Sequence, residues 1–194
     1  MDDAGTRSAR AHRRYGGTAL KITSPDPLHP NGARVLAALR EEGSDAVIVE
    51  TLEPSPTALA AAAQLDITVG QVANSLVFDA EGEPVLILTS GAHRVDTDHV
   101  AMVIGVSSLK RASAEFVRAA TGQPIGGVAP LGHPRPIRTY LDLALAEFSE
   151  VWAAGGHPHY VFRTSFEELL RITHATPISV TPGSDASTPV TSSS

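Results

Sequence analysis

The stretch NSLVFDAEGEPVLIL, residues 74–88, decides the fold. Two apolar runs, 74–78 and 85–88, flank the acidic segment 79–83, which contains a glycine. Short apolar runs separated by a segment of this kind predict a β-hairpin. We expect its two strands to lie near the centre of a sheet.

Upstream of the hairpin the sequence predicts a helix, a strand and a second helix. Pro30 suits the first position of a helix, and Gly43 supplies a left-handed stop. Ser55 and Pro56 offer a cap and a first-turn proline to the alanine-rich stretch that follows. The expected helices are 30–42 and 57–65, and the expected strand is 46–50.

Downstream of the hairpin, helix signals and strand signals are interspersed. Asp96 can cap a helix that Gly105 ends, and Ser165 with Glu168 forms the pattern of a capping box. The expected helices are 97–104, 113–120 and 165–174, and the expected strands are 137–141, 150–153 and 159–163. Because no strict βαβ alternation appears, the predicted fold class is α/β of the α+β type, a single domain with a mixed sheet flanked by helices.

The amino-acid composition limits the classes of function that are possible. The 194 residues include 42% apolar and 19% charged side chains, which is typical of one globular domain. There is no cysteine, so disulfides, thiolate metal sites and a cysteine nucleophile are excluded. Neither a membrane-length apolar run nor a signal peptide is present, and we expect a cytoplasmic protein. The expected organisation is an N-terminal arm at 1–24, a folded domain at 25–181 and a disordered tail at 182–194.

The charge is unevenly distributed. The net charge is −6, whereas residues 1–21 carry an excess of three positive charges. A basic arm on an acidic body can supply phosphate contacts to a nucleic acid. The alternative is a solvated, disordered arm with no such role.

Residues 122–136 contain four glycines and four prolines, too many for a helix or a central strand. Within them, the segment 126–132 can aim backbone N–H groups at a carbonyl or an oxyanion. The alternative is a tight connection that serves only the fold. No GK[ST] follows, so this is no Walker-type phosphate loop.

A second glycine-rich turn, 155–159, can present His157 at the end of a sheet, either as an ordinary turn residue or as a group that binds a ligand. Asp142 follows an expected strand and can accept a ligand hydroxyl or cap the next segment. A metal site formed by His133, His157, His159 and Asp142 is an alternative, although no HExxH motif is present. GxSxG and GxGxxG motifs are absent too, and Ser75 is interpreted as a strand residue.

Several segments in this order resemble the YbaK/EbsC family, which includes the editing domain inserted in bacterial prolyl-tRNA synthetases and its free-standing relatives. The matching segments are VANSLVF at 72–78, TSGAHRV at 89–95, TGQPIGGVAPLGH at 121–133, TYLD at 139–142 and AAGGHP at 153–158. The resemblance covers about residues 28–180. Its most specific element is the spacing of the GGVxPxG loop, the following aspartate and the GGHP turn.

The resemblance implies a single α/β domain with a mixed, partly barrel-like sheet and an aminoacyl-tRNA deacylase that acts in trans on misacylated tRNA, such as alanyl- or cysteinyl-tRNA(Pro). It implies no metal and no cofactor, and chemistry that uses a positioned water or a substrate hydroxyl. The expected partners are tRNA and a synthetase, with neither membrane nor DNA. The implied catalytic residues are Gly127, Pro130, Gly132 and Asn74, and the implied substrate-binding residues are Ser75, Gly126, Asp142, Gly156 and His157.

One position departs from the family pattern. Asn74 stands where the family usually has a lysine, and a neutral amide cannot supply that positive charge. Altered substrate choice, replacement by an arginine such as Arg94 or Arg135, and loss of catalysis with binding retained are three open outcomes. The alternatives to a deacylase are therefore a non-catalytic aminoacyl-tRNA or aminoacyl-adenosine binding module and a small-molecule esterase.

Overall fold

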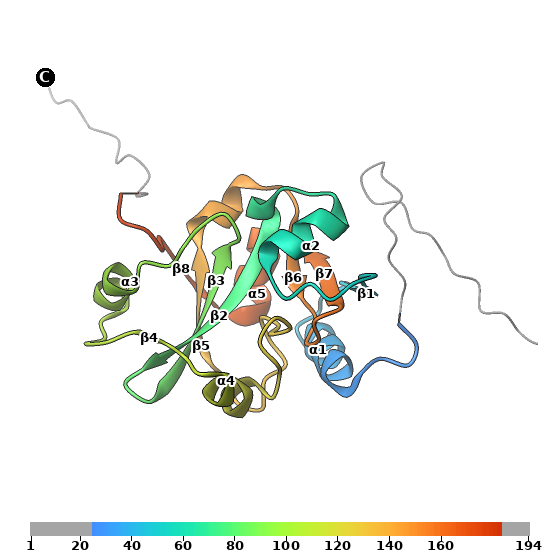
Figure 1. Ribbon diagram of the computed structural model, residues 1–194, viewed down its shortest axis with the longest axis horizontal. Coiled ribbons are helices and arrows are strands. Elements are labelled where there is room, and N and C mark those ends of the chain that lie inside the picture. Colours follow the sequence, from blue (N-terminus) through green and yellow to red (C-terminus); the bar gives the residue numbers. More distant parts are fainter. Residues whose placement is uncertain (1–24, 184–194) are drawn as a thin grey trace, which may run out of the picture.

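The computed structural model describes residues 25–183 (Figure 1). The predicted arm at 1–24, and the part of the predicted tail beyond 183, lie outside the described residues. The helices are α1 (Pro30–Glu41), α2 (Ala58–Leu65), α3 (Thr97–Ile104), α4 (Ala114–Thr121) and α5 (Phe166–Thr173), with two 3-10 helices, η1 (Val69–Gln71) and η2 (Leu143–Glu147). The strands are β1 (Ile48–Glu50), β2 (Val72–Ala80), β3 (Glu83–Ser90), β4 (Lys110–Arg111), β5 (Arg138–Asp142), β6 (Val151–Ala154), β7 (Tyr160–Thr164) and β8 (Thr176–Ile178).

The predicted hairpin is confirmed and has a tighter turn than expected. Ala80 of β2 pairs with Glu83 of β3, so only Glu81 and Gly82 form the turn. Both have positive φ, 58° and 93°, as a type I′ turn requires. The Asp79 carboxylate accepts the Gly82 N–H at 2.6 Å and holds the turn closed.

The strands form one mixed sheet in the order β1-β7-β6-β2-β3-β5-β8, with β4 paired to β2. β2 pairs with β3 from Ala73 to Ala80. On its other side it pairs with β6 only at Val72 and Ala73, and with β4 only at Phe78 and Asp79. Residues 74–77 therefore have one free edge. In a β-strand, alternate residues point their backbone N–H and C=O groups to the same edge.

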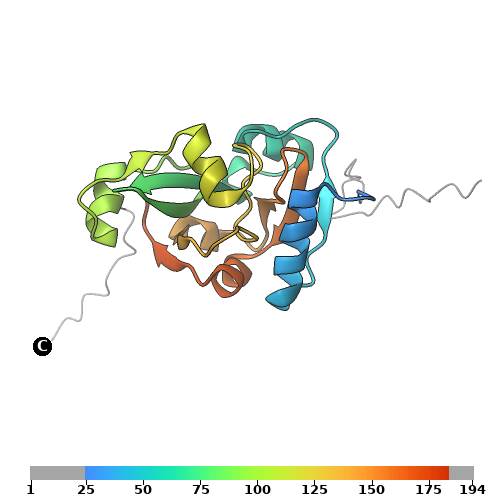
Figure 2. The same ribbon diagram turned by 90° about the horizontal axis from the view of Figure 1, so that it is seen from below.

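Helices cover both faces of the sheet. Leu86 and Leu88 of β3 pack in the main core with residues of α1, α4 and α5. Val85 and Ile87 point to the opposite face and pack with Val100 of α3. Two views show α1 and α5 next to each other, on the side away from α2 (Figures 1 and 2). Successive residues of β3 thus pack against helices on opposite faces of the sheet, which confirms that the hairpin is central.

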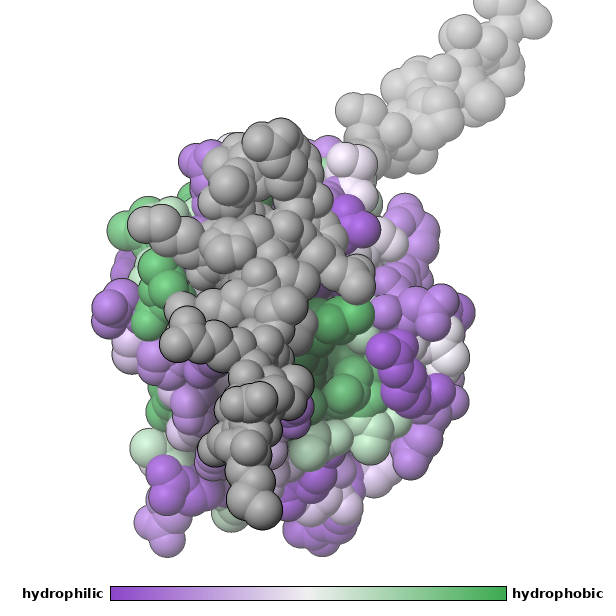
Figure 3. Space-filling view, turned by 90° about the vertical axis from the view of Figure 1, so that its right-hand side faces the viewer, coloured by the Kyte–Doolittle hydropathy of each residue, from purple (hydrophilic) through white to green (hydrophobic). Residues whose placement is uncertain are grey.

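The edge strand β1 lies on the right-hand side of Figure 1, and Figure 3 turns that side to the reader. The visible surface there carries hydrophobic areas between hydrophilic margins (Figure 3). Val47 and Leu52, which flank β1, are exposed. β1 has only three residues, and so short an edge limits pairing with another chain. None of the helices within residues 25–183 has the length and apolar character needed to cross a membrane.

Every predicted helix and strand is present, with bounds that shift by only a few residues. No pattern in the sequence predicts β4 or β8, which have two and three residues. Strands this short contain no full period of alternation, and only their partners β2 and β5 define them.

The predicted cap of α2 was wrong. Thr57, not Ser55, caps the helix, and its hydroxyl oxygen accepts the Ala60 N–H at 3.2 Å. Ser55 is buried, and its hydroxyl accepts the Gln64 side-chain N–H at 2.7 Å. The helix therefore begins after the Ser-Pro pair, and Ser55 connects the preceding loop to the body of α2.

The predicted capping box of α5 is only half formed. The Ser165 hydroxyl accepts the Glu168 N–H at 3.2 Å, as predicted. The Glu168 carboxylate, however, accepts hydrogen bonds from Ser44 at 2.6 Å and from Thr164 at 3.0 Å. It thus links α5 to Ser44, in the segment after α1, and to Thr164, and the bond to the Ser165 N–H that completes a capping box is not formed.

Leu141 and Leu143 offer a matched test of the core. Leu141 is 0% exposed in the main core, whereas Leu143 is 44% exposed. We expect Leu141→Ala to lower the free energy of unfolding by about 2–5 kcal/mol, because it leaves a cavity. Leu143→Ala should change it by less than about 0.5 kcal/mol. Urea denaturation followed by circular dichroism measures both, and equal losses would contradict this packing.

Candidate functional site

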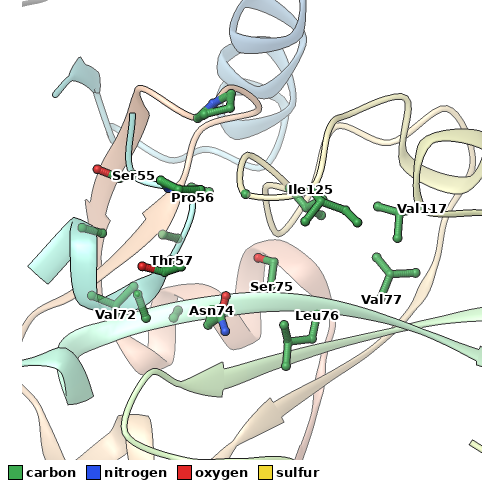
Figure 4. A pocket seen from close by; sticks show the side chains of 18 of the residues that line it. Ser55, Pro56, Thr57, Val72, Asn74, Ser75, Leu76, Val77, Val117 and Ile125 are labelled. Atoms are coloured by element: carbon green, nitrogen blue, oxygen red, sulfur yellow. The ribbon is translucent and has the colours of Figure 1, made fainter. Parts of the chain in front are cut away.

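A cleft of ≈ 650 Å³ lies along the free edge of β2. Residues 74–77 form its floor, the start of α2 and segment 93–97 form two walls, and the loop at 125–128 stands opposite. Figure 4 shows Ser75 and Val77 on the side of β2 that faces Ile125 and Val117, with Leu76 on the other side. The incomplete pairing of β2 therefore opens the cleft.

Two predicted residues, Asn74 and Ser75, line this cleft. Because they are consecutive on β2, their side chains point to opposite faces of the strand: Ser75 lies on the side of Val77, and Asn74 on the side of Leu76. The Asn74 amide makes no hydrogen bond within the described part of the chain. The Ser75 hydroxyl is buried there and also lacks a partner. Both polar groups are free to bind a ligand.

The loop that faces them is fixed by its own contacts. The Gln123 side-chain oxygen accepts the Ala129 N–H at 2.7 Å, and the Gly127 N–H donates to the Pro124 carbonyl at 3.0 Å. A Cβ on Gly127 would lie 2.7 Å from the His157 carbonyl carbon, so only glycine permits this approach. The loop and the GGHP turn are thus packed together.

Gly126 and Val128, on either side of Gly127, line the cleft. Their N–H groups donate to no acceptor within residues 25–183. Backbone donors held in place in this way can bind a carbonyl oxygen or stabilise an oxyanion.

The second half of the predicted loop lies elsewhere. Pro130 and Gly132 line a different hollow of ≈ 520 Å³ between α1 and α5, not the cleft. A Cβ on Gly132 would approach Val35 of α1 to 3.1 Å, and Gly156 also packs closely against Val35. These residues hold the loop and the GGHP turn against α1, at a distance in the fold from Asn74.

His157 lies beside the cleft, not in its lining. Its ring centroid lies 4.9 Å from that of His29, 5.6 Å from that of His159 and 5.0 Å from that of Tyr160. Burial lowers the pKa of His157, and the charges of His29 and His159 lower it further, while Glu50 opposes them. The cluster supports Tyr160, which does line the cleft.

Asp142 lies behind the cleft and is 2% exposed. One carboxylate oxygen accepts from the Thr89 hydroxyl at 3.0 Å, the Ser90 N–H at 3.0 Å and the His93 ring at 2.9 Å. The other caps η2 through the Ala144 N–H at 3.1 Å. Asp142 thus combines the capping role with positioning of His93, which lines the cleft.

Positive charge enters the cleft from two arginines. Arg94 and Arg111 line it, are exposed and form no ion pair within the described residues. Arg135, the other arginine considered as a replacement for the lysine, lines the hollow between α1 and α5. Sequence reasoning missed Arg111 and His93, because only the sheet pairing and the Asp142 contact place them there.

The residues considered for a metal site lie apart. His133 lines the hollow between α1 and α5, with its Nε2 2.9 Å from the Ala129 carbonyl oxygen, while Asp142 lies behind His93. In residues 25–183 no group of three or more histidine, aspartate or glutamate side chains is arranged to hold a metal ion.

Comparison with known proteins agrees with this architecture. Residues 53–172 match the model of the aminoacyl-tRNA editing domain. The chain belongs to the aminoacyl-tRNA editing domain family, which confirms the resemblance predicted from its motifs.

Three relatives place the chain within the family. A crystal structure of a candidate trans-editing enzyme for prolyl-tRNA synthetase has a TM-score of 0.75 and 40% identity, and the match covers 80% of this chain and 99% of that one. The uncharacterized protein YwhH of Bacillus subtilis (strain 168) is 30% identical over 63% of this chain and 78% of its own length. The proline–tRNA ligase of Bacillus licheniformis is 31% identical over 53% of this chain, but the match spans only 18% of that ligase. The sheet and helices match the fold of the trans-editing structure, as the family resemblance predicted.

His133 makes stability depend on pH. Its burial lowers the imidazole pKa, and the hydrogen bond to Ala129 only partly opposes this. The unfolded chain therefore binds the proton more readily than the folded one, so stability is complete above about pH 6.5 and is lost as pH falls below it. We expect the melting temperature of His133→Gln to fall less between pH 7.5 and 5.5 than that of the wild type. Differential scanning calorimetry measures both. An identical fall in melting temperature in the two proteins would show that groups other than His133 cause the pH dependence.

Proposed function

We propose that this protein is an aminoacyl-tRNA deacylase that acts in trans and hydrolyses the ester of tRNA misacylated with a small amino acid. The observation that carries the proposal is the cleft along the free edge of β2, whose opposite loop contributes Gly126 and Val128, two residues whose N–H groups donate to no acceptor within residues 25–183. Membership of the editing-domain family supports it. A site of this kind needs no cysteine nucleophile, and the chain has none.

In this mechanism the carbonyl oxygen of the ester accepts hydrogen bonds from Gly126 and Val128. Water adds to the carbonyl carbon, the bond between that carbon and the ribose oxygen breaks, and the ribose oxygen takes a proton. Each donor stabilises the negative charge of the tetrahedral intermediate by about 3–4 kcal/mol. A positioned water, or the neighbouring ribose hydroxyl of the substrate, supplies the remaining chemistry.

Arg94 and Arg111 supply the charge that Asn74 lacks. They come from different elements, the segment after β3 and strand β4, and flank the same cleft. Their unpaired guanidinium groups can bind the phosphates at the 3′ end of tRNA. This favours replacement of the lysine by an arginine, among the outcomes left open by the sequence.

A second candidate is a binding module that holds an aminoacyl-adenosine group without hydrolysis. It is favoured by Asn74 itself, because within the described residues no lysine lines the cleft. A neutral amide can orient a ligand, but it stabilises developing negative charge less well than an ammonium group does.

A deacylation panel separates these two candidates. We expect the wild type to release amino acid from misacylated tRNA faster than buffer does, with alanyl- and cysteinyl-tRNA(Pro) as reference substrates, and Asn74→Lys to change the preference among substrates. Release of radiolabelled amino acid measures both. A wild type without activity on any member, together with activity gained by Asn74→Lys, would support the binding module and contradict the deacylase.

Arg94 and Arg135 form a matched pair for phosphate binding. We expect Arg94→Ala to raise KM for aminoacyl-tRNA about tenfold, the effect of one charge-assisted hydrogen bond, and to weaken its salt dependence. Arg135→Ala should leave KM unchanged, because Arg135 lies outside the cleft. Steady-state kinetics at two salt concentrations measure this. An equal rise in KM in the two variants would contradict a direct phosphate contact, because it would show that Arg94 acts only through its long-range charge.

A further inference from the structure

His93 is the one histidine within residues 25–183 that lines the cleft. The other charged or titratable side chains of this lining are Arg94, Arg111 and Tyr160. Neither an arginine nor a neutral tyrosine accepts a proton readily at neutral pH. An imidazole does, so His93 is the side chain of the cleft that suits proton transfer.

The contact with Asp142 decides which nitrogen of the His93 ring can act. Nδ1 lies 2.9 Å from the Asp142 carboxylate oxygen Oδ2. A carboxylate only accepts hydrogen bonds, so Nδ1 carries the hydrogen and donates it, and in the neutral ring the lone pair is on Nε2. Nε2 has no hydrogen-bond partner within the described residues, and the side chain is 32% exposed. The nitrogen that can accept a proton is thus the one that Asp142 leaves free.

Asp142 is itself fixed, so it can hold the ring in one orientation. It is 2% exposed, and Oδ2 also accepts the Thr89 hydroxyl and the Ser90 N–H, each at 3.0 Å. Its other oxygen accepts the Ala144 N–H at 3.1 Å. The His93 backbone N–H donates to the Ser90 carbonyl at 2.9 Å, which fixes the turn that carries the ring. A catalytic group held in this way loses little freedom when the substrate binds.

The histidines beside the cleft do not share this arrangement. In His157 and His29, Nδ1 accepts a backbone N–H, at 3.4 Å and 3.2 Å, so in the neutral rings Nε2 carries the hydrogen. His159 Nδ1 lies 3.2 Å from the Thr51 carbonyl oxygen, which leaves the lone pair on Nε2, but His159 is not part of the cleft lining. Within the described residues, His93 alone combines a free Nε2 lone pair with a place in the cleft.

His93 and the loop that carries the free N–H groups both approach the start of α2. A Cβ on Gly91, two residues before His93, would lie 2.6 Å from the Ala58 Cβ. A Cβ on Gly126 would lie 2.9 Å from the Pro56 Cα. Pro56 and Ala58 both line the cleft. The imidazole and the Gly126 N–H thus border the same part of the cleft, next to residues 56–58.

We propose that His93, held by Asp142, is the general base of the deacylation and takes a proton from the attacking water at Nε2. This inference rests on the proposed function. As the water oxygen bonds to the carbonyl carbon, one water proton moves to Nε2. When the bond between that carbon and the ribose oxygen breaks, the imidazolium gives this proton to the ribose oxygen, which leaves the free amino acid and a ribose hydroxyl. Asp142 stabilises the imidazolium and does not take the proton.

A matched pair of histidine variants tests the role of His93. In His93→Asn the side-chain amide nitrogen takes the place of Nδ1 and can donate to Asp142, but the amide cannot take up a proton. We expect kcat on alanyl-tRNA(Pro) to fall about 100-fold or more, with little change in KM. His174→Asn keeps the wild-type kcat, because His174 is exposed and has a left-handed backbone that asparagine tolerates.

The pH dependence of kcat is a readout that a merely structural role of His93 would not change. In the wild type and in His174→Asn, kcat falls from about pH 8 to about pH 6, because a protonated imidazole accepts no proton. In His93→Asn this fall is absent. A His93→Asn variant with the kcat and the pH profile of the wild type would overturn the inference.

A modified substrate supplies a second test that needs no variant. Alanyl-tRNA(Pro) that ends in 2′-deoxyadenosine lacks the ribose hydroxyl beside the ester. We expect kcat of the wild type on it to fall less than about tenfold, because His93 and not this hydroxyl takes the proton. An inactive deoxy substrate would overturn the inference, since the ribose hydroxyl would then be the base.

Hydrolysis of 4-nitrophenyl acetate separates this inference from the proposed function, because it needs a base but no tRNA. If the wild type hydrolyses this ester, His93→Asn does not, and no misacylated tRNA is hydrolysed, the deacylase proposal fails and His93 stands as the base. If His93→Asn hydrolyses misacylated tRNA as fast as the wild type does, the inference fails and the deacylase stands. A wild type that hydrolyses neither kind of ester would contradict both.

Discussion

The pairing of β2 is the constraint on which the site depends. β3 covers one edge of β2 completely, whereas β6 and β4 hold the other edge only at its two ends. A central strand with one edge unpaired over four residues would expose backbone groups at a cost, unless a ligand or a facing loop used them. Here the loop at 125–128 faces the gap and a cleft remains between them. The same irregularity thus creates the cleft and places Asn74 and Ser75 in its lining.

The polar groups around this gap are held by interactions that leave the cleft itself free. The buried Asp142 carboxylate joins β5 to the end of β3 and orients His93, and Gln123 and Gly127 fix the loop against the GGHP turn. Groups fixed in this way need little reorganisation when charge develops in a transition state. The proposed chemistry, which uses backbone donors and a water, therefore suits a chain without cysteine.

Asn74 leaves the floor of the cleft without charge, and positive charge lies around it. Arg94 and Arg111 are exposed and unpaired within the described residues, so they can bind phosphate without the desolvation that a buried cation requires. The floor itself, residues 74–77, contains no charged side chain.

The sequence by itself determined the helices, the hairpin and the family. Caps such as Asp96 and Ser165, the glycine at the hairpin turn and the apolar runs act over a few residues and can be recognised locally. It did not determine β4 or β8, nor which residues of the glycine-rich loop reach the cleft. Pro130 and Gly132 carry the same kind of signal as Gly126, yet they face α1 and α5. Only the tertiary structure decided this, because strand pairing and the packing of α1 join segments more than a hundred residues apart in the chain.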